Sequence, residues 1–314
     1  MKINLLITGG LGYIGSFTAK KYLEKIKKKS FVIDNLSRGN LFAKKYSNCK
    51  IIDISNKSLH KFIEKKKINT IIHLASFTCV RESIKNKRKY LKNYKSQIKF
   101  IDNIKKTKVK FFIFSSSLSV FEKNKFKRNL SPYSMYKLKV EKYLKTISSK
   151  DFKVIILRYP NIIGSDPNGG LGEKNDFISR IVPLFYKSLL KMKKITLYYD
   201  YNKKIFPRRN YMHVEDIANI NLKVLENLKK FESNYSIFNI KNREEYSNSE
   251  VLKSLSKILN KKPLISLKQI NKKESINQII ASKNDILRKI NYKIKYKNLK
   301  KILKTNLKWF KKIY

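Results

Sequence analysis

The stretch "LLITGGLGYIGS", residues 5–16, decides the fold. It places four glycines (Gly9, Gly10, Gly12 and Gly15) within seven positions, in a chain with 9 glycines among 314 residues. The loop follows an apolar run typical of a buried strand and precedes a segment with the apolar spacing of a helix. Glycines in this context permit a tight turn and let a phosphate approach the backbone at the helix N-terminus. The stretch therefore predicts a strand–loop–helix unit that binds a dinucleotide.

An acidic residue supports this prediction. The next apolar run ends in Asp34, 19 residues after Gly15. A carboxylate at the end of the second strand accepts hydrogen bonds from the ribose hydroxyls of the adenosine, which favours NAD over phosphorylated NADP. We therefore expect NAD as the cofactor.

Apolar runs alternate with lysine-rich segments of helical spacing through the first half of the chain. Strands are expected at 3–8, 30–33, 50–52, 70–74, 110–115 and 154–158, and helices at 16–28, 58–66, 90–105 and 132–147. Continuous apolar strands separated by helices indicate a parallel sheet covered on both faces. The fold class predicted is α/β, a Rossmann-type doubly wound parallel sheet.

The alternation fades after about residue 160. Two further helices are expected near 249–259 and 299–310, and "YSIFNI" (235–240) has the pattern of a strand that returns to the large sheet. We predict an NAD-binding Rossmann domain over 1–163, with 210–240 returning to it. Residues 164–209 and 241–314 are expected to form a smaller C-terminal α/β substrate domain.

The formal net charge is +51, which raises the hypothesis of an RNA-binding or other anion-binding protein. The excess comes from 63 lysines against 10 arginines, spread evenly along the chain. A nucleic-acid surface more often clusters its charge and uses arginine for phosphate and base contacts. We therefore expect no specific nucleic-acid function.

Cellular location and metal binding are constrained by what the sequence contains. Its two cysteines, Cys49 and Cys79, lie far apart without metal-ligand spacing, which indicates a reducing compartment. No apolar stretch approaches the roughly 18 residues of a membrane-spanning helix. A cytoplasmic protein without a metal site and without membrane contact is expected.

A candidate chemical centre follows the strand "FFIFSSSLSV" (111–120). The segment "SPYSMYKLKVEKYL" (131–144) puts Tyr133 and Lys137 one helical turn apart, on one face. A lysine ammonium beside a tyrosine stabilises the phenolate, so that the tyrosine can act as a base. Ser117 completes a Ser/Tyr/Lys set that can bind a substrate hydroxyl or carbonyl. These three are the predicted catalytic residues.

Further stretches carry a family resemblance: "VIDNLSRGN" (32–40), "IIDIS" (51–55), "HLAS" (73–76), "YLKNY" (90–94), "LRYPNIIGSDPNGGLGE" (157–173) and "RRNYMHVEDIA" (208–218). Together with the Ser/Tyr/Lys set, they resemble the extended short-chain dehydrogenase/reductase family, and within it the UDP-glucose 4-epimerase type. The resemblance covers nearly the whole chain. It implies these cofactor ligands: Gly9, Gly12, Tyr13, Ile14, Gly15, Asp34, Asn35, Ser37, Arg38, Gly39, Asp53, Ile54, Leu74, Ala75, Ser76, Asn93, Ser115, Tyr133, Lys137 and Pro160.

The same resemblance implies how a nucleotide sugar is held. The implied substrate ligands are Thr78, Ser117, Tyr133, Asn161, Arg209, Lys272 and Ile279. Arg209 is the expected diphosphate ligand, with Arg208 as its rival. Lys272 aligns with the family's second diphosphate arginine, and Ile279 with the residue that gates the sugar's 2-position.

The resemblance implies an NAD-dependent epimerase that inverts C4 of a UDP-hexose through a transient 4-keto sugar. Related dehydratases carry two acids after the serine, whereas this chain has Leu118 and Ser119, so dehydration is disfavoured. The alternative is another nucleotide-sugar reaction: epimerisation of an N-acetylated or uronic sugar, decarboxylation or reduction. The family usually dimerises through two helices, here 90–105 and 132–147, so a homodimer is expected.

Overall fold

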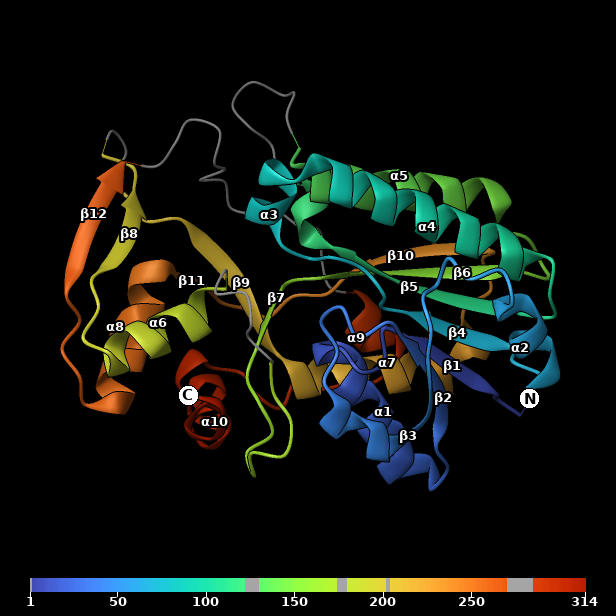
Figure 1. Ribbon diagram of the computed structural model, residues 1–314, viewed down its shortest axis with the longest axis horizontal. Helices are drawn as coiled ribbons and strands as arrows, with labels where there is room; N and C mark the ends of the chain where they lie inside the picture. The colour runs from blue at the N-terminus through green and yellow to red at the C-terminus, as the bar shows by residue number, and fades with distance from the viewer. Residues whose placement is uncertain (1, 122–129, 174–179, 202–203, 270–284) are drawn as a thin grey trace.

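The computed structural model describes residues 2–121, 130–173, 180–201, 204–269 and 285–314. Its largest sheet has the strand order β10-β6-β5-β4-β1-β2-β3, and every neighbouring pair is parallel (Figure 1). In chain order these strands are β1 (Leu5–Thr8), β2 (Ser30–Asp34), β3 (Ser47–Ile51), β4 (Thr70–His73), β5 (Phe111–Ser117), β6 (Lys153–Tyr159) and β10 (Tyr235–Asn239). The predicted doubly wound α/β fold is confirmed.

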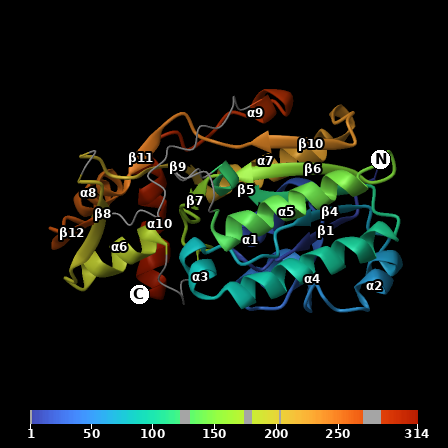
Figure 2. The same cartoon turned by 90° about the horizontal axis from the view of Figure 1, so that it is seen from above.

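Helices cover both faces of this sheet. One face carries α1 (Tyr13–Ile26), α7 (Val214–Glu226) and α9 (Asp285–Lys289), and the other carries α2 (Leu59–Lys65), α4 (Lys87–Lys105) and α5 (Pro132–Ile147) (Figures 1 and 2). In β5, Ile113 packs in the first core, while Phe112 and Phe114 pack in the second. Because both faces are buried, the strands are continuously apolar, which is why they stood out in the sequence.

All seven expected strands are present, and "YSIFNI" returns to the large sheet beside β6. Among the expected helices, α5 spans the predicted residues, and α1, α2 and α4 lie within three residues of theirs. The edge strand β3 begins three residues earlier than predicted. Its first residues, Ser47, Asn48 and Cys49, give no apolar run.

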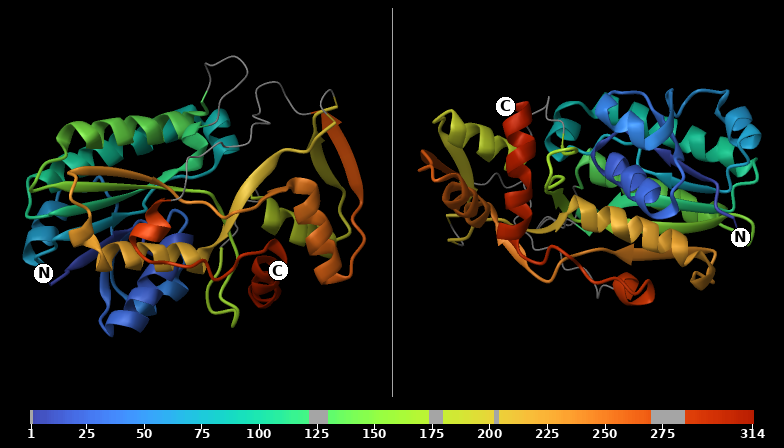
Figure 3. Two further views of the ribbon diagram at one scale, coloured as in Figure 1. Left: turned by 180° about the vertical axis from the view of Figure 1, so that it is seen from behind. Right: turned by 90° about the horizontal axis from the view of Figure 1, so that it is seen from below.

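A second group of elements lies at one end of the sheet (Figures 2 and 3). It contains α6 (Ile181–Leu190), α8 (Asn248–Leu259) and α10 (Leu299–Ile313), the parallel pair β8 (Ile195–Tyr199) and β12 (Ile265–Gln269), and a sheet of β11 (Glu245–Ser247), β9 (Arg208–His213) and β7 (Asn161–Ile163). These elements share a separate core around Trp309, Phe310, Phe185 and Tyr186. The proposed division into two domains stays a prediction, and residues 210–213 lie in the smaller sheet.

None of the helices in the described part of the chain is long and apolar enough to cross a membrane.

A buried ion pair fastens β6 to α5. Both carboxylate oxygens of Glu141 are bound by Arg158, at 2.9 Å from Nε and 2.5 Å from Nη2, and Ser116 donates its hydroxyl to the same carboxylate. The side chains of Glu141 and Arg158 are 2% and 12% exposed. The bidentate pair thus joins β5, β6 and α5 directly beneath the predicted chemical centre.

We expect Glu141→Gln to lower the free energy of unfolding by about 3–5 kcal/mol, because it leaves the Arg158 charge buried without its partner. The double variant Glu141→Leu/Arg158→Met, which removes both charges, should cost much less. Urea unfolding of the single and double variants measures the difference.

The matched control is Lys25→Met, which breaks a surface ion pair with Glu226 and should cost about 1 kcal/mol or less. A Glu141→Gln loss no larger than the Lys25→Met loss would contradict the structural role of the buried pair.

Candidate functional site

The glycine loop, which we call the glycine cradle, packs so closely against neighbouring backbone that side chains would not fit at Gly9 and Gly15. Gly9 has φ +65°, a conformation that favours glycine, and a Cβ there would lie 2.8 Å from the backbone of Ala75. A Cβ on Gly15 would lie 2.2 Å from the carbonyl oxygen of Gly9. Gly12 caps α1 without a side-chain hydrogen bond, and the first turn of the helix holds no acid. The N–H groups of the loop itself, from Gly9 to Gly12, are bonded to Ile33, Asp34 and Gly9. The first turn of α1 therefore supplies the backbone N–H groups and the positive end of a helix dipole for an anion.

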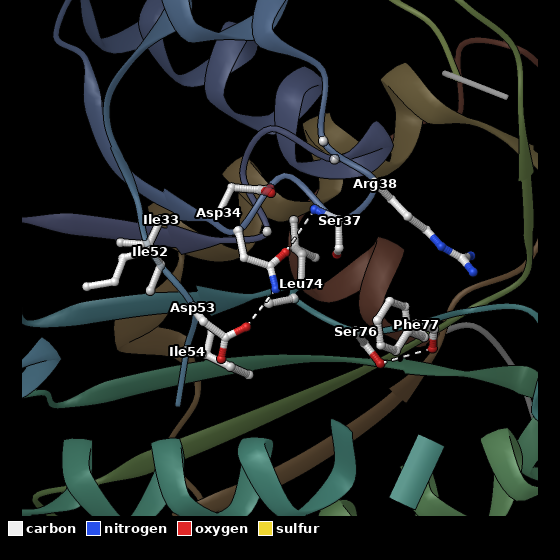
Figure 4. Close-up of a pocket in the computed structure, with 15 residues that line it drawn as sticks. Ile33, Asp34, Ser37, Arg38, Ile52, Asp53, Ile54, Leu74, Ser76 and Phe77 are labelled. Atoms are coloured by element: carbon white, nitrogen blue, oxygen red, sulfur yellow. Dashed lines mark hydrogen bonds between the residues drawn. The ribbon is translucent and has the colours of Figure 1, made fainter. Parts of the chain in front are cut away.

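Beside the loop lies an open cleft of about 540 Å³ (Figure 4). Its apolar walls come from Ile33, Ile52, Ile54, Leu74 and Ala75, and its polar groups from Asp34, Asn35, Ser37 and Asp53. Gly39, Arg38, Ser76 and Phe77 also line it. A slot with apolar sides and carboxylates at one end suits an adenosine.

Two carboxylates in this cleft are held in place by hydrogen bonds. Asp34 accepts backbone N–H bonds from Leu11 at 3.0 Å and Leu36 at 2.8 Å. Burial raises the pKa of the Asp34 carboxyl, and these backbone bonds oppose the rise. Asp53 accepts a hydrogen bond from Asn35 Nδ2 at 2.6 Å. Each carboxylate keeps lone pairs for a ribose or base, because a carboxylate accepts about four hydrogen bonds.

A second cleft, of about 960 Å³, shares the glycine loop with the first. Tyr13, Ile14, Gly15 and Ser16 of α1 line it, together with Ser37, Arg38, Ser76 and Thr78. Three more lining residues, Gly172, Glu173 and Arg180, come from the C-terminal half of the chain. The Arg180 guanidinium donates to Thr78 Oγ1 at 2.9 Å and forms an ion pair with Glu173 Oε1, 2.8 Å from its Nε.

The predicted catalytic residues meet where β5 ends and α5 begins. Ser117 is the last residue of β5, and Tyr133 lies in the first turn of α5 and is 8% exposed. Ser131 caps α5 by accepting the N–H of Ser134, whose hydroxyl donates to Ser119 Oγ at 2.9 Å. These serine contacts fix the start of the helix, and with it Tyr133, against the short 3₁₀ helix η2 (Leu118–Phe121) that follows β5.

Lys137 lies one turn further along α5 and is 4% exposed. Its ammonium donates to the carbonyl of Ser115 at 2.7 Å and lies 4.6 Å from the ring centroid of Phe114. Burial lowers the pKa of Lys137 to about 7, and the nearby Glu141 carboxylate limits the fall. The structure thus joins Lys137 directly to Ser115, two residues before Ser117.

A buried polar set supports the segment after β4. His73 is 1% exposed, stacks on Phe100, Phe112 and Phe114, and hydrogen-bonds Thr8 Oγ1 through Nδ1 at 2.8 Å. Burial lowers the pKa of His73 to about 3, so it is neutral and structural. The Asn93 side-chain oxygen accepts bonds from Gln97 at 3.0 Å and from Ser76 and Phe77 at 3.4 Å.

The predicted substrate ligands are only partly placed. Pro160 and the exposed Asn161 lie where β6 passes into β7. Arg208 binds Glu250 at 2.8 Å and the carbonyl of Glu245, and Arg209 donates to the carbonyl of Arg208 at 2.8 Å. The choice between them as diphosphate ligand stays a prediction. Lys272 and Ile279 lie outside the described residues.

Glu173 and Arg180 are site residues that sequence reasoning missed. Neither belongs to an apolar pattern, and the helix that Arg180 precedes was not anticipated. One signal was available in the sequence. Arginine is scarce in this lysine-rich chain, so Arg180 could have been singled out as an uncommon residue.

Within the described residues, no three His, Cys, Asp or Glu side chains gather in a way that could hold a metal ion. A parallel α/β sheet, a glycine cradle at a helix N-terminus and a Ser/Tyr/Lys set beside it define a dinucleotide-dependent enzyme of the short-chain dehydrogenase/reductase type.

The comparisons with known proteins agree with this class. Residues 5–240 match the NAD dependent epimerase/dehydratase family, and the chain belongs to that family. It is 25% identical to UDP-glucose 4-epimerase of Streptococcus mutans, with 97% of this chain and 96% of that protein covered. It is 31% identical to the UDP-glucose 4-epimerase of Yersinia enterocolitica, covering 82% and 83%. The structure of UDP-glucose 4-epimerase from Brucella ovis in complex with NAD superposes with a TM-score of 0.86 at 25% identity, over 97% of each chain.

The lowered pKa of Lys137 predicts a pH dependence of stability. An unfolded lysine has a pKa of about 10.4, so between about pH 7 and 10 the unfolded chain binds more protons at this position than the folded one. The folded protein without cofactor should therefore gain stability relative to Lys137→Met as the pH rises from 7 to 10, by at most about 1.4 kcal/mol per pH unit.

Urea unfolding of both proteins at several pH values measures this difference. Lys139→Met, which removes an exposed lysine from the same helix, is the control for loss of surface charge. A wild-type advantage over Lys137→Met that does not change with pH would contradict the prediction.

Proposed function

We propose that this chain is an NAD-dependent epimerase that inverts C4 of a UDP-hexose. The relatives named above, which match it over most of their lengths, support the reaction. The observation that carries the proposal is the hydrogen bond from the Lys137 ammonium to the Ser115 carbonyl, which joins the helix that bears Tyr133 and Lys137 to the strand that ends in Ser117. The close approach of backbone at Gly9 and Gly15 fits the pyrophosphate of NAD, because only a loop without side chains admits it.

Tyr133 serves as the base in this proposal. Its phenolate takes the proton of the 4-hydroxyl while C4 gives up its hydride. Bound NAD supplies the reversible hydride acceptor. Ser117 donates a hydrogen bond to the reacting oxygen, and the Lys137 ammonium, held by the Ser115 carbonyl, stabilises the phenolate. Tyr133 then returns the proton after the 4-keto sugar has turned and received hydride on its other face.

The nucleotide half of the substrate is bound away from C4. Arg209 on β9 and Asn161 at the start of β7 are the proposed diphosphate ligands, and β7 and β9 are paired strands. Arginine suits this role because its planar fork matches phosphate geometry. An anchored diphosphate lets the sugar turn without leaving the site, so remote binding energy supports the chemistry.

We expect Tyr133→Phe to reduce interconversion of UDP-glucose and UDP-galactose by at least about 100-fold, because the base is lost, while NAD stays bound. The matched control is Tyr136→Phe on the same helix, whose ring stacks on Tyr94 and which should keep near wild-type turnover. Both variants are assayed chromatographically with no cofactor added.

Activity of Tyr133→Phe close to that of Tyr136→Phe would remove Tyr133 from the base role. If wild-type protein that contains NAD interconverts no 4-epimer pair, another nucleotide-sugar reaction on the same scaffold would replace the proposal. A reductase would be recognised by stoichiometric consumption of NADH or NADPH.

A homodimer formed through α4 and α5 is part of the proposal. Leu91 on α4 is 38% exposed and Ile84 on the preceding helix α3 (Val80–Lys85) is 51% exposed, so apolar surface is available on this face of the molecule. The lysines of both helices would then lie at the rim of the interface. We also place the protein in the reducing interior of the cell, as its two free cysteines suggest.

A further inference from the structure

Arg180 occupies an unusual position for a residue of the C-terminal half. It is the N-cap residue of α6, whose apolar face packs through Val182, Phe185 and Leu189 into the separate core of that half. Its side chain nevertheless lines the cleft formed by the glycine loop and α1. A cation on a well-packed helix is therefore directed into the cofactor site.

Two contacts fix the Arg180 guanidinium. It donates a hydrogen bond to Thr78 Oγ1 at 2.9 Å, in the segment that follows β4, and forms an ion pair with Glu173 Oε1 at 2.8 Å. Glu173 is itself held from α10, because Trp309 Nε1 donates to its carbonyl at 2.9 Å and the Trp309 ring packs where Gly172 has no side chain. Arg180 thus connects the segment after β4 with the C-terminal half.

Besides the Glu173 carboxylate, the surroundings of Arg180 contain groups that favour an anion. The same cleft contains Gly9, Gly12 and the uncapped first turn of α1. The charge of Arg180 also interacts with Tyr13 of α1 and with Tyr133 of α5. Burial raises the pKa of Glu173, and both Arg180 and Arg38 oppose the rise. The two arginines therefore act on one carboxylate within one cleft.

We propose that Arg180 binds the pyrophosphate of the cofactor, as a cation that the C-terminal half adds to the glycine loop. This inference rests on the proposed function. A pyrophosphate carries two negative charges, which a helix N-terminus with about half a positive charge compensates only in part. A guanidinium fork binds phosphate oxygens in pairs. Because Arg180 lines the same cleft as Gly9 and Gly12, we assign it to the diphosphate of the cofactor and not to that of the sugar nucleotide.

The proposal gives the two halves of the chain a shared ligand. The glycine loop and Thr78 belong to the large sheet, whereas α6 and Glu173 are packed against the elements of the smaller core. A cofactor bound between them would be released only when both sets of contacts are broken. Tight retention of NAD through repeated turnovers then follows from the architecture.

The test is calorimetric titration of NAD into protein freed of cofactor, for wild type, Arg180→Gln and Arg180→Lys. Arg180→Gln should raise the Kd for NAD at least tenfold, and Arg180→Lys by less, since lysine keeps the charge but loses the fork. Arg243→Gln, which removes one exposed arginine from the same half, should leave the Kd unchanged. The KM for UDP-galactose at saturating NAD should be the same in wild type and Arg180→Gln.

An NAD Kd for Arg180→Gln within twofold of wild type would overturn the inference. An unchanged Kd with a raised KM would assign Arg180 to the diphosphate of the sugar nucleotide instead. If Arg180→Gln does not fold, Thr78→Val, which removes the hydrogen bond that orients the guanidinium, should still raise the Kd severalfold. Wild-type protein that binds no NAD would instead overturn the proposed function, a result distinct from an effect missing only in the variants.

Discussion

The contact of the glycine loop with its two neighbours is the constraint on which the site depends. A Cβ on Gly9 would lie 2.8 Å from the backbone of Ala75 after β4, and one on Gly15 of α1 would lie 2.2 Å from the Gly9 carbonyl oxygen. These approaches set the distance between β1, β4 and the first turn of α1. They therefore place the anion cradle, the carboxylate of Asp34 and the segment from Leu74 to Thr78 around one cleft. A single methyl group at either glycine would separate these parts.

Several of the few acidic residues of this chain are buried, where they hold structural elements together. The chain has 22 acidic residues against 73 basic ones, and several of the acids hold structural junctions. Glu141 joins three elements through Arg158 and Ser116, and Asp216 accepts the backbone N–H groups of Lys295 and Tyr296. Because each such carboxylate is paired or hydrogen-bonded, its burial is tolerated. The large positive charge is thus a property of the surface.

This arrangement bears on the chemistry at Lys137. Its ammonium is buried, bound to one carbonyl and close to an aromatic ring, while Glu141 is already occupied by Arg158. The lysine is therefore incompletely compensated, which is why burial lowers its pKa. An anionic phenolate at Tyr133 would complete the compensation. In the proposed mechanism, the charge of the buried ammonium offsets part of the cost of forming the Tyr133 phenolate, which burial by itself would disfavour.

The sequence predicted those elements whose apolar residues follow a regular pattern and missed those whose pattern is broken by polar residues. The large sheet was predictable because its strands are buried on both faces, and the glycine loop because its spacing is fixed by backbone contacts. In the C-terminal half, β12 is largely exposed and mixes Leu267 with Lys268, so its strand pattern is weak. The helix α7 escaped notice because Glu215, Asp216 and Asn221 are buried among its apolar residues, which blurs the usual polar face.

The arginines show how compositional bias can be turned into a signal. Lysine supplies most of the positive charge of this chain, and arginine, with its planar fork, is rare. Some arginines, such as Arg88 and Arg243, are simply exposed at the surface. Arg38, Arg158, Arg180 and Arg208 all form ion pairs with carboxylates, and three of them lie at or beneath the proposed site. Arginines that pair with carboxylates therefore point to the site more directly than the net charge does. A search for arginine in lysine-rich chains of this family would find positions such as Arg180 that no glycine or Tyr/Lys motif contains.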